Sequence, residues 1–148
     1  MRIEELDVLC RQAAHDLVER ETRPLPPAVV VPLPEATSVT TFPGFPNDDR
    51  TRFDLLTRFA AEKMRPVNAP AFGFLAEATM DAEPGPVDVV VVVYGARRHH
   101  SSITAAPLTE QGLGEFLAPE ELEPTAFPFL APLRHAVDAA QPPDAIPT

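Results

Sequence analysis

The sequence has few of the features that mark secreted or membrane-spanning proteins. Its single cysteine, Cys10, excludes a framework of intrachain disulfides. The longest run of aliphatic residues is Val89–Val93, whereas a helix that crosses a membrane needs about 20 consecutive apolar residues. Three of the first seven residues are acidic, and a secretory signal would instead begin with basic residues. We therefore expect a cytoplasmic protein with no membrane partner.

The motifs that bind nucleotides, metals or acyl substrates are also missing. The six glycines are scattered, so there is no glycine-rich phosphate loop, and neither a G-x-S-x-G nor an H-E-x-x-H pattern occurs. His99 and His100 are adjacent, but neighbouring residues of a strand point to opposite faces and are poorly placed to chelate one ion. We expect neither a metal nor a cofactor.

Basic residues are scarce in the second half of the chain. The net charge is −10; residues 1–74 carry 11 acidic and 9 basic side chains, whereas residues 75–148 carry 11 acidic and only 3 basic ones. Proteins that bind nucleic acid normally present a basic patch, so we expect no nucleic-acid partner. One lysine against eleven arginines, together with abundant alanine and proline, is typical of a GC-rich bacterial genome.

Hydrophobic periodicity predicts three helices. The predicted helices cover residues 3–20, 48–64 and 129–140, with a shorter helical piece near residues 109–117. Cys10 lies in the apolar stripe of the first helix, which predicts a buried and unreactive thiol. Asn47 or Asp48 is the predicted cap of the second helix, because a side-chain oxygen there accepts hydrogen bonds from free backbone N–H groups.

Apolar runs between turn signals predict four strands, or five if a short one is included. They cover residues 28–33, 38–42, 72–80, 88–96 and 101–108, and the short one is residues 38–42. If the two hairpin loops close symmetrically, Met80 lies opposite Asp88 and Ala96 lies opposite Ser101. This register gathers one apolar face from three strands: Phe74, Ala76, Ala78, Val90, Val92, Tyr94, Ile103 and Ala105.

These elements predict one α+β domain over residues 1–141, followed by a proline-rich tail at residues 142–148. The domain contains a mainly antiparallel sheet of four to five strands, with three helices packed on its apolar face. Because three helices cannot cover both faces, we expect the other face to associate with a protein partner or with a second copy in a homodimer. That face carries Leu75, Val89, Val91 and Val93.

Proline braces the loops, with 19 prolines in the chain and seven of them between Pro24 and Pro46. Two of the proline-rich segments carry phenylalanines, at residues 42–46 and 127–129. We expect these rings to close the edge of the core. The alternative is an exposed apolar patch that contacts a partner.

Two polar features are candidates for a binding site. The segment Arg97, Arg98, His99 and His100 holds two of the three basic residues of its half, and arginine pairs bidentately with carboxylates; the alternative is a solvated hairpin tip. Glu77 lies in mid-strand among apolar neighbours, where burial would raise its pKa. The alternative for Glu77 is a solvent-facing side chain, or one that is paired with an arginine such as Arg52 or Arg98.

Without a catalytic motif, the sequence predicts a non-catalytic protein-interaction or regulatory module rather than an enzyme. A first alternative is a small-molecule-binding protein or small enzyme that uses Glu77 with the Arg97–His100 loop. A second is an acidic mimic of nucleic acid, which requires the acidic side chains to line one surface.

Overall fold

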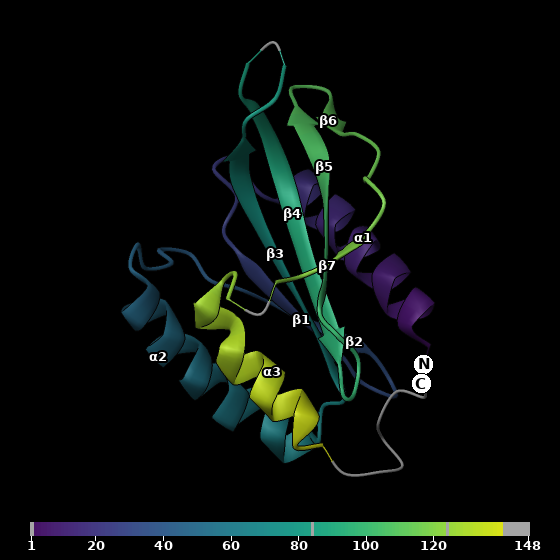
Figure 1. The fold of residues 1–148 in the computed structure, drawn as a ribbon, viewed down its shortest axis with the longest axis vertical. Helices are drawn as coiled ribbons and strands as arrows, with labels where there is room; N and C mark the ends of the chain where they lie inside the picture. The colour runs from purple at the N-terminus through teal and green to yellow at the C-terminus, as the bar shows by residue number, and fades with distance from the viewer. Residues whose placement is uncertain (1, 84, 124, 141–148) are drawn as a thin grey trace.

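Helix α1 (Ile3–Arg20) lies against one face of a curled antiparallel sheet, and helices α2 (Asp49–Phe59) and α3 (Ala131–Asp138) lie against the other (Figure 1). The computed structural model describes residues 2–83, 85–123 and 125–140. The predicted single α+β domain is confirmed, and α1 has the bounds that its apolar stripe predicts. The predicted tail at residues 142–148 lies outside the described residues.

The sheet has the strand order β2–β1–β3–β4–β5–β6, and β7 pairs with the start of β5. Within the described residues the strands are β1 (Ala28–Pro32), β2 (Thr37–Thr41), β3 (Ala71–Met80), β4 (Val87–Ala96), β5 (Ser102–Thr109), β6 (Gly112–Leu113) and β7 (Glu120–Glu121). Every pairing is antiparallel, as predicted. The strand count exceeds the predicted four to five because β6 and β7 add two-residue strands along β5.

The region near residues 109–117 contains β6 in place of the predicted helical piece. Gly112 has a φ of +112°, far outside the range of a right-handed helix. The chain therefore turns back and pairs with the end of β5, where Thr109 lies opposite Gly112. This turn is the physical reason that the helix prediction is wrong here.

Both long hairpins close one residue away from the predicted register. The first loop is residues 81–86, six residues rather than seven, and Met80 therefore pairs with Val87. The second loop is residues 97–101, five residues rather than four. Because side chains alternate along a strand, a shift of one residue moves each side chain to the other face relative to its neighbouring strand.

The shift divides the predicted apolar face between two cores. Phe74 pairs with Val93, which in turn pairs with Ile103, and these residues face α2 and α3. The rest of the predicted set in β4 faces α1: Val90, Val92 and Tyr94. The prediction that Phe74 and Ile103 share a face with these three residues is therefore wrong.

The expectation that all three helices cover one face is corrected by the same observation. Strand β1 is buried along its whole length. Its Val30 belongs to the core under α1, whereas Val29 and Val31 belong to the core under α2 and α3. Because both faces of the central strands are apolar, each face needs a helical layer of its own.

Helix α2 is capped by Asp48, one of the two predicted cap residues. The Asp48 carboxylate accepts hydrogen bonds from the Thr51 backbone N–H at 2.8 Å and from the Thr51 hydroxyl at 2.7 Å. These bonds lower the pKa of Asp48 below its ordinary value. The helix continues through a π turn, η1 (Ala60–Met64), and a 3₁₀ turn, η2 (Arg65–Val67).

The proline-braced phenylalanines close the core on the α2 and α3 side. Phe45 contacts Phe74 and Phe129, with ring centroids 6.0 Å apart in each pair. Phe129 lies in the 3₁₀ turn η3 (Pro128–Leu130), directly before α3. The Arg52 guanidinium lies over both Phe45 and Phe129, 5.4 and 5.2 Å from the ring centroids. These contacts favour the predicted role of the phenylalanines as core residues.

Helix α1 packs so closely on β3 that one glycine is required at the contact. A Cβ atom on Gly73 would lie 2.5 Å from the Cys10 sulfur and 3.3 Å from Cβ of Val30. Cys10 is fully buried, and burial raises the pKa of its thiol to about 12. The predicted burial of Cys10 is confirmed, and a raised thiol pKa disfavours the reactive thiolate.

Candidate functional site

A cavity of about 470 Å³ opens at the end of the sheet where the β4–β5 loop meets α3. Its walls are the loop residues 98–101, residues 122, 123 and 126–128, and the exposed side of α3. Its apolar lining residues are Phe72, Val93, Leu122, Ala126, Phe127, Pro128, Leu130 and Ala131. Its polar lining residues are Arg98, His99, His100, Ser101, Glu123, Arg134, His135 and Asp138.

Arg134 of α3 fastens the β4–β5 loop to the helix. Its guanidinium donates to the backbone carbonyl of His99 at 2.7 Å, to the carbonyl of Ala96, and to the Ser101 hydroxyl at 3.3 Å. It also donates to both carboxylate oxygens of Asp138, at 2.6 and 3.1 Å. One side chain thus joins two strand ends and a helix at the wall of the cavity.

Gly95 makes room for this arginine. A Cβ atom on Gly95 would lie 2.8 Å from Nη1 of Arg134 and 2.8 Å from the Ser101 hydroxyl. The Arg134 guanidinium can therefore lie over the end of β4 only because residue 95 has no side chain. Burial of Asp138 raises its pKa, but the hydrogen bonds and the positive charge of Arg134, together with a backbone hydrogen bond from Arg98, outweigh burial, so the pKa of Asp138 is lowered.

The loop conformation separates the two predicted arginines. Arg98 has a φ of +67°, and the His99 N–H donates to the Ala96 carbonyl at 3.0 Å, so the loop makes a tight turn. Arg98, His99 and His100 line the cavity, whereas Arg97 does not. The backbone N–H of Arg97 donates to the Pro70 carbonyl. The structure therefore brings together three of the four residues predicted in this loop.

The cavity also gathers most of the histidines of the protein. Three of the four line it, namely His99, His100 and His135, and the fourth is His15 of α1. His100 makes an ion pair with Glu121 of β7 at 3.1 Å when it is protonated. Because Arg134 and Asp138 neutralise each other, the remaining fixed charges at the cavity are those of Arg98 and Glu123.

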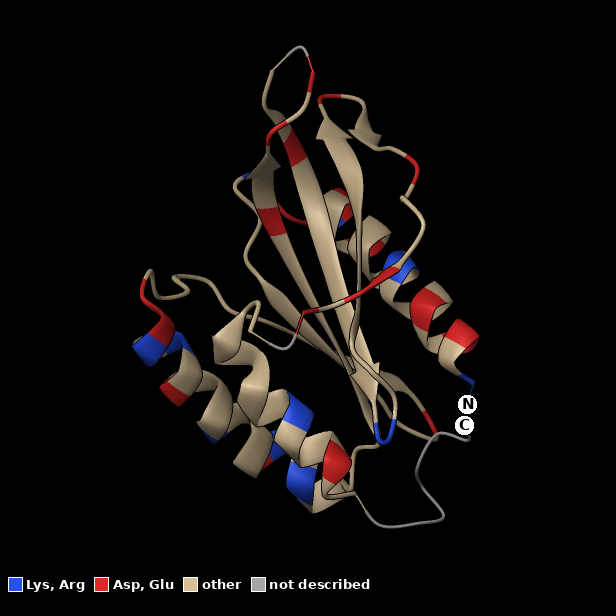
Figure 2. Cartoon of the chain, viewed as in Figure 1, with Lys and Arg blue, Asp and Glu red and all other residues tan. Residues whose placement is uncertain are grey.

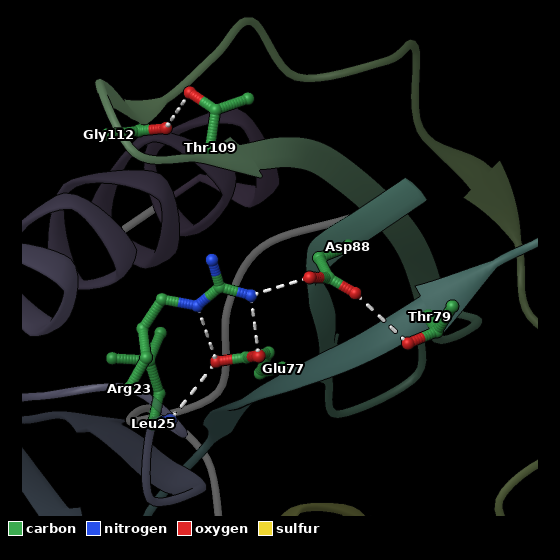
Figure 3. Close-up of polar contacts among 7 residues, drawn as sticks. All are labelled: Arg23, Leu25, Glu77, Thr79, Asp88, Thr109 and Gly112. Atoms are coloured by element: carbon green, nitrogen blue, oxygen red, sulfur yellow. Dashed lines mark hydrogen bonds and ion pairs between the residues drawn. The ribbon is translucent and has the colours of Figure 1, made fainter. Parts of the chain in front are cut away.

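Glu77 does not line the cavity. It belongs to a cluster of polar contacts with Arg23 and Leu25 (Figure 3). Its carboxylate accepts from Nε and Nη2 of Arg23 at 3.3 and 2.9 Å and from the Leu25 backbone N–H at 3.1 Å. Nη2 of Arg23 also donates to Asp88 at 2.7 Å. The hydrogen bond from Arg23 lowers the pKa of Glu77, which corrects the expected rise. The partner is neither Arg52 nor Arg98, because Glu77 faces the connection between α1 and β1.

The predicted self-association face does not exist as one surface. Leu75 lies in the core under α1, and Val93 lies in the core under α2 and α3. Val89 is 2 % exposed, and Val91 is half-buried beside the second core. The one-residue shift in register places Leu75 and the three valines on opposite faces, and helices cover both faces.

Sequence reasoning did not select Arg23 or Arg134, the two arginines that organise the polar contacts. Arg134 lies four residues before Asp138, a spacing that indicates an ion pair on a helix but not the loop that the arginine also binds. Arg23 follows α1, and its role depends on β1 lying beside β3, which no local pattern reveals.

Among residues 2–83, 85–123 and 125–140, no group of three or more histidine, cysteine or acidic side chains could hold a metal ion. None of the helices in this part of the chain is long and apolar enough to span a membrane. Comparison of the chain with protein-family models, with curated proteins and with solved structures finds no match in any of the three.

Proposed function

We propose that this protein is a non-catalytic binding module whose cavity takes a small organic acid. The ligand would have an apolar body and one carboxylate. The observation that carries the proposal is the convergence of Arg98 and three of the four histidines on one cavity with an apolar floor. A volume of about 470 Å³ is within the range of small-molecule sites in proteins, which are mostly apolar with a few polar groups.

The polar groups divide into those already satisfied and those available to a ligand. Arg134 is committed to two carbonyls, a hydroxyl and Asp138. The Arg98 side chain has no ion-pair partner within the described part of the chain, and it is exposed at the cavity wall. A carboxylate that enters the cavity can therefore pair with Arg98, because charge-assisted bonds of this kind are among the stronger polar contacts.

The apolar lining supplies the second half of the recognition. Phe72 and Val93 come from the sheet, and Leu122, Phe127 and Leu130 come from the segment that leads into α3. A linear or aromatic hydrocarbon body of about six carbons fits within a cavity of about 470 Å³, and each buried CH₂ group contributes about 0.8 kcal/mol.

This proposal develops the small-molecule alternative and omits Glu77, which is held by Arg23. The acidic-mimic alternative gains no support. The acidic side chains are spread over α1, the β3–β4 hairpin and the segments after β5, and the basic loop between β4 and β5 lies beside α3 (Figure 2).

Titration of the ¹⁵N-labelled protein with matched acids and amides tests the proposal. Hexanoate and benzoate should bind saturably and shift the resonances of residues 98–101 and of α3, whereas hexanamide and benzamide should bind at least about tenfold more weakly. Arg98→Ala should weaken hexanoate binding by about tenfold, which corresponds to about 1.4 kcal/mol.

Arg97→Ala is the matched control, because it removes the same charge from the same turn but from outside the cavity. It should change hexanoate binding by less than about twofold, since Arg97 does not line the cavity and charges outside it are partly screened by salt. Equal binding of acids and amides, or equal loss in both arginine variants, would contradict the proposal.

A further inference from the structure

The two edges of the sheet differ in whether other segments of the chain form hydrogen bonds with them. Later segments of the chain cover the edge formed by β5 with three backbone hydrogen bonds. Leu122 N–H donates to the Ser101 carbonyl at 2.8 Å, and Leu117 N–H donates to the Ala105 carbonyl at 2.9 Å. Gly114 N–H donates to the Pro107 carbonyl at 2.8 Å. The opposite edge is β2, and within the described residues no segment pairs with its outer side.

The hydrogen bonds at the two ends of the β1–β2 hairpin establish which backbone groups of β2 point outward. The Leu33 N–H donates to the Ala36 carbonyl at 3.1 Å, and the Phe42 N–H donates to the Pro27 carbonyl at 2.8 Å. Because bonded pairs alternate in an antiparallel ladder, the even-numbered residues of β2 bond to β1. The N–H and C=O groups of Thr37, Val39 and Thr41 therefore point away from the sheet.

The outer edge of β2 lacks the devices by which proteins protect such edges. Residues 37–41 contain no charged side chain and no proline, and four of the five are β-branched. The side chain at the centre, Val39, is 46 % exposed. Open edges of this kind are templates for a further strand, and proteins that keep them free usually place lysine, proline or a bulge there.

A groove of about 540 Å³ runs beside this edge, between β2 and α1. Thr37, Val39 and Thr41 line it from the strand, and Leu9, Ala13 and Leu17 are its apolar residues from the helix. The side chains of an added strand would therefore enter an existing groove.

We propose that β2 pairs with β2 of a second copy of this chain, antiparallel and with its two-fold axis at Val39. The sequence of the strand is self-complementary in this register, because Val39 lies opposite the second copy's Val39 and Thr37 lies opposite its Thr41. The three outward-pointing residues of each strand then form about six hydrogen bonds across the interface.

Two further observations favour a second copy as the occupant. The charged residues that line the groove between β2 and α1 are Asp16, Arg20 and Glu21, which sum to a net charge of only −1. Two copies can therefore approach through this edge with little repulsion, despite a net charge of −10 on each chain. A two-fold axis perpendicular to the sheet also places both α1 helices on one face, so that the two grooves merge and bury both Val39 side chains.

Cysteine cross-linking tests the register. Val39→Cys should form a disulfide-linked dimer under mild oxidation, because residues of a bonded antiparallel pair have Cα atoms about 5.5 Å apart, within the range of a disulfide. Thr37→Cys alone should not, because Cα atoms of the two copies' residue 37 would be about 14 Å apart. A mixture of Thr37→Cys and Thr41→Cys chains should cross-link. The native Cys10 is buried and does not compete.

Sedimentation tests the assembly. Wild-type protein, with a chain mass of 16.1 kDa, should sediment as a dimer at about 100 μM, and Val39→Lys should be a monomer because two like charges meet at the axis. Val67→Lys is the matched control, since Val67 is 47 % exposed in η2, and it should remain a dimer.

A monomeric wild type at this concentration would overturn the proposal and leave the edge to a strand of another protein. A dimer that persists in Val39→Lys would also overturn it, as would equal cross-linking of the Val39→Cys and Thr37→Cys chains.

Discussion

Replacement of Gly73 by alanine tests the closest contact between α1 and the sheet. The new Cβ would lie 2.5 Å from the Cys10 sulfur and 3.3 Å from Val30 Cβ, and neither side chain has exposed space to move into. Overpacking of this kind costs about 1–3 kcal/mol. We expect Gly73→Ala to lower the free energy of unfolding by that amount.

The Cys10→Ala variant tests whether the loss of stability in Gly73→Ala comes from the steric clash with the Cys10 sulfur. Alone it removes one buried sulfur and should cost about 1 kcal/mol. In the double variant the Cβ of residue 73 meets Cβ of residue 10 at 3.7 Å, which is an ordinary contact, and only the 3.3 Å contact with Val30 remains tight. The double variant should therefore be about 1–2 kcal/mol more stable than the sum of the single effects predicts.

Urea unfolding followed by far-ultraviolet circular dichroism measures these differences, because the chain has no tryptophan. Gly85→Ala is the control, since a Cβ there meets no atom within 4 Å, and its stability should change by less than about 0.5 kcal/mol. Additive effects of Gly73→Ala and Cys10→Ala would refute the steric reasoning.

Two further predictions concern the arginines that organise the polar contacts. Arg23→Gln should lower the melting temperature at pH 7, and the difference from wild type should shrink below about pH 4. The reason is that Arg23 lowers the pKa values of Glu77 and Asp88, so its contacts stabilise the fold only while both carboxylates are ionised. An equal difference at pH 7 and pH 3 would contradict this. Arg134→Met should lower the free energy of unfolding by about 1–3 kcal/mol, since the Ala96 and His99 carbonyls lose their donor. Arg58→Met on α2 should change it by less than about 0.5 kcal/mol in the same urea titration, and equal losses in the two variants would exclude a special role for Arg134.

The sequence predicts the bounds and buried side of a helix, which depend on local periodicity, better than it predicts the register of a hairpin. The stripe that contains Leu6, Cys10 and Leu17 repeats over five turns, so it determines both the bounds of α1 and its buried side. The register of a hairpin instead depends on whether its loop has an odd or even number of residues. Boundary errors of one residue, at Val87 and at Ser102, were therefore enough to move Phe74 and Ile103 to the other face.

Only the part of the candidate site that is marked by a local sequence feature could be predicted. Arg98, His99 and His100 stand out because basic residues are rare in their half of the chain, and this contrast is visible without a structure. The opposite wall, with His135 and Arg134 of α3, comes from about 35 residues further along the chain and depends on the packing of α3 across β4. Glu77 stood out equally, but its partner Arg23 lies 54 residues away, beyond any local pattern.

The short ladder between β1 and β3 joins two parts of the sheet, the β1–β2 hairpin and the three strands β3, β4 and β5. Strands β3, β4 and β5 follow one another as hairpins with long ladders, whereas β1 meets β3 over three residue pairs only, Ala28 with Leu75, Val29 with Phe74 and Val30 with Gly73. This short ladder is covered by α1 on one face and by the core under α2 and α3 on the other. Fewer backbone pairs therefore hold the β1–β2 hairpin to β3 than hold β4 to its neighbours. The amide hydrogens of the hairpin should exchange with solvent through a smaller opening free energy than those of β4, and a partner bound at β2 would slow that exchange.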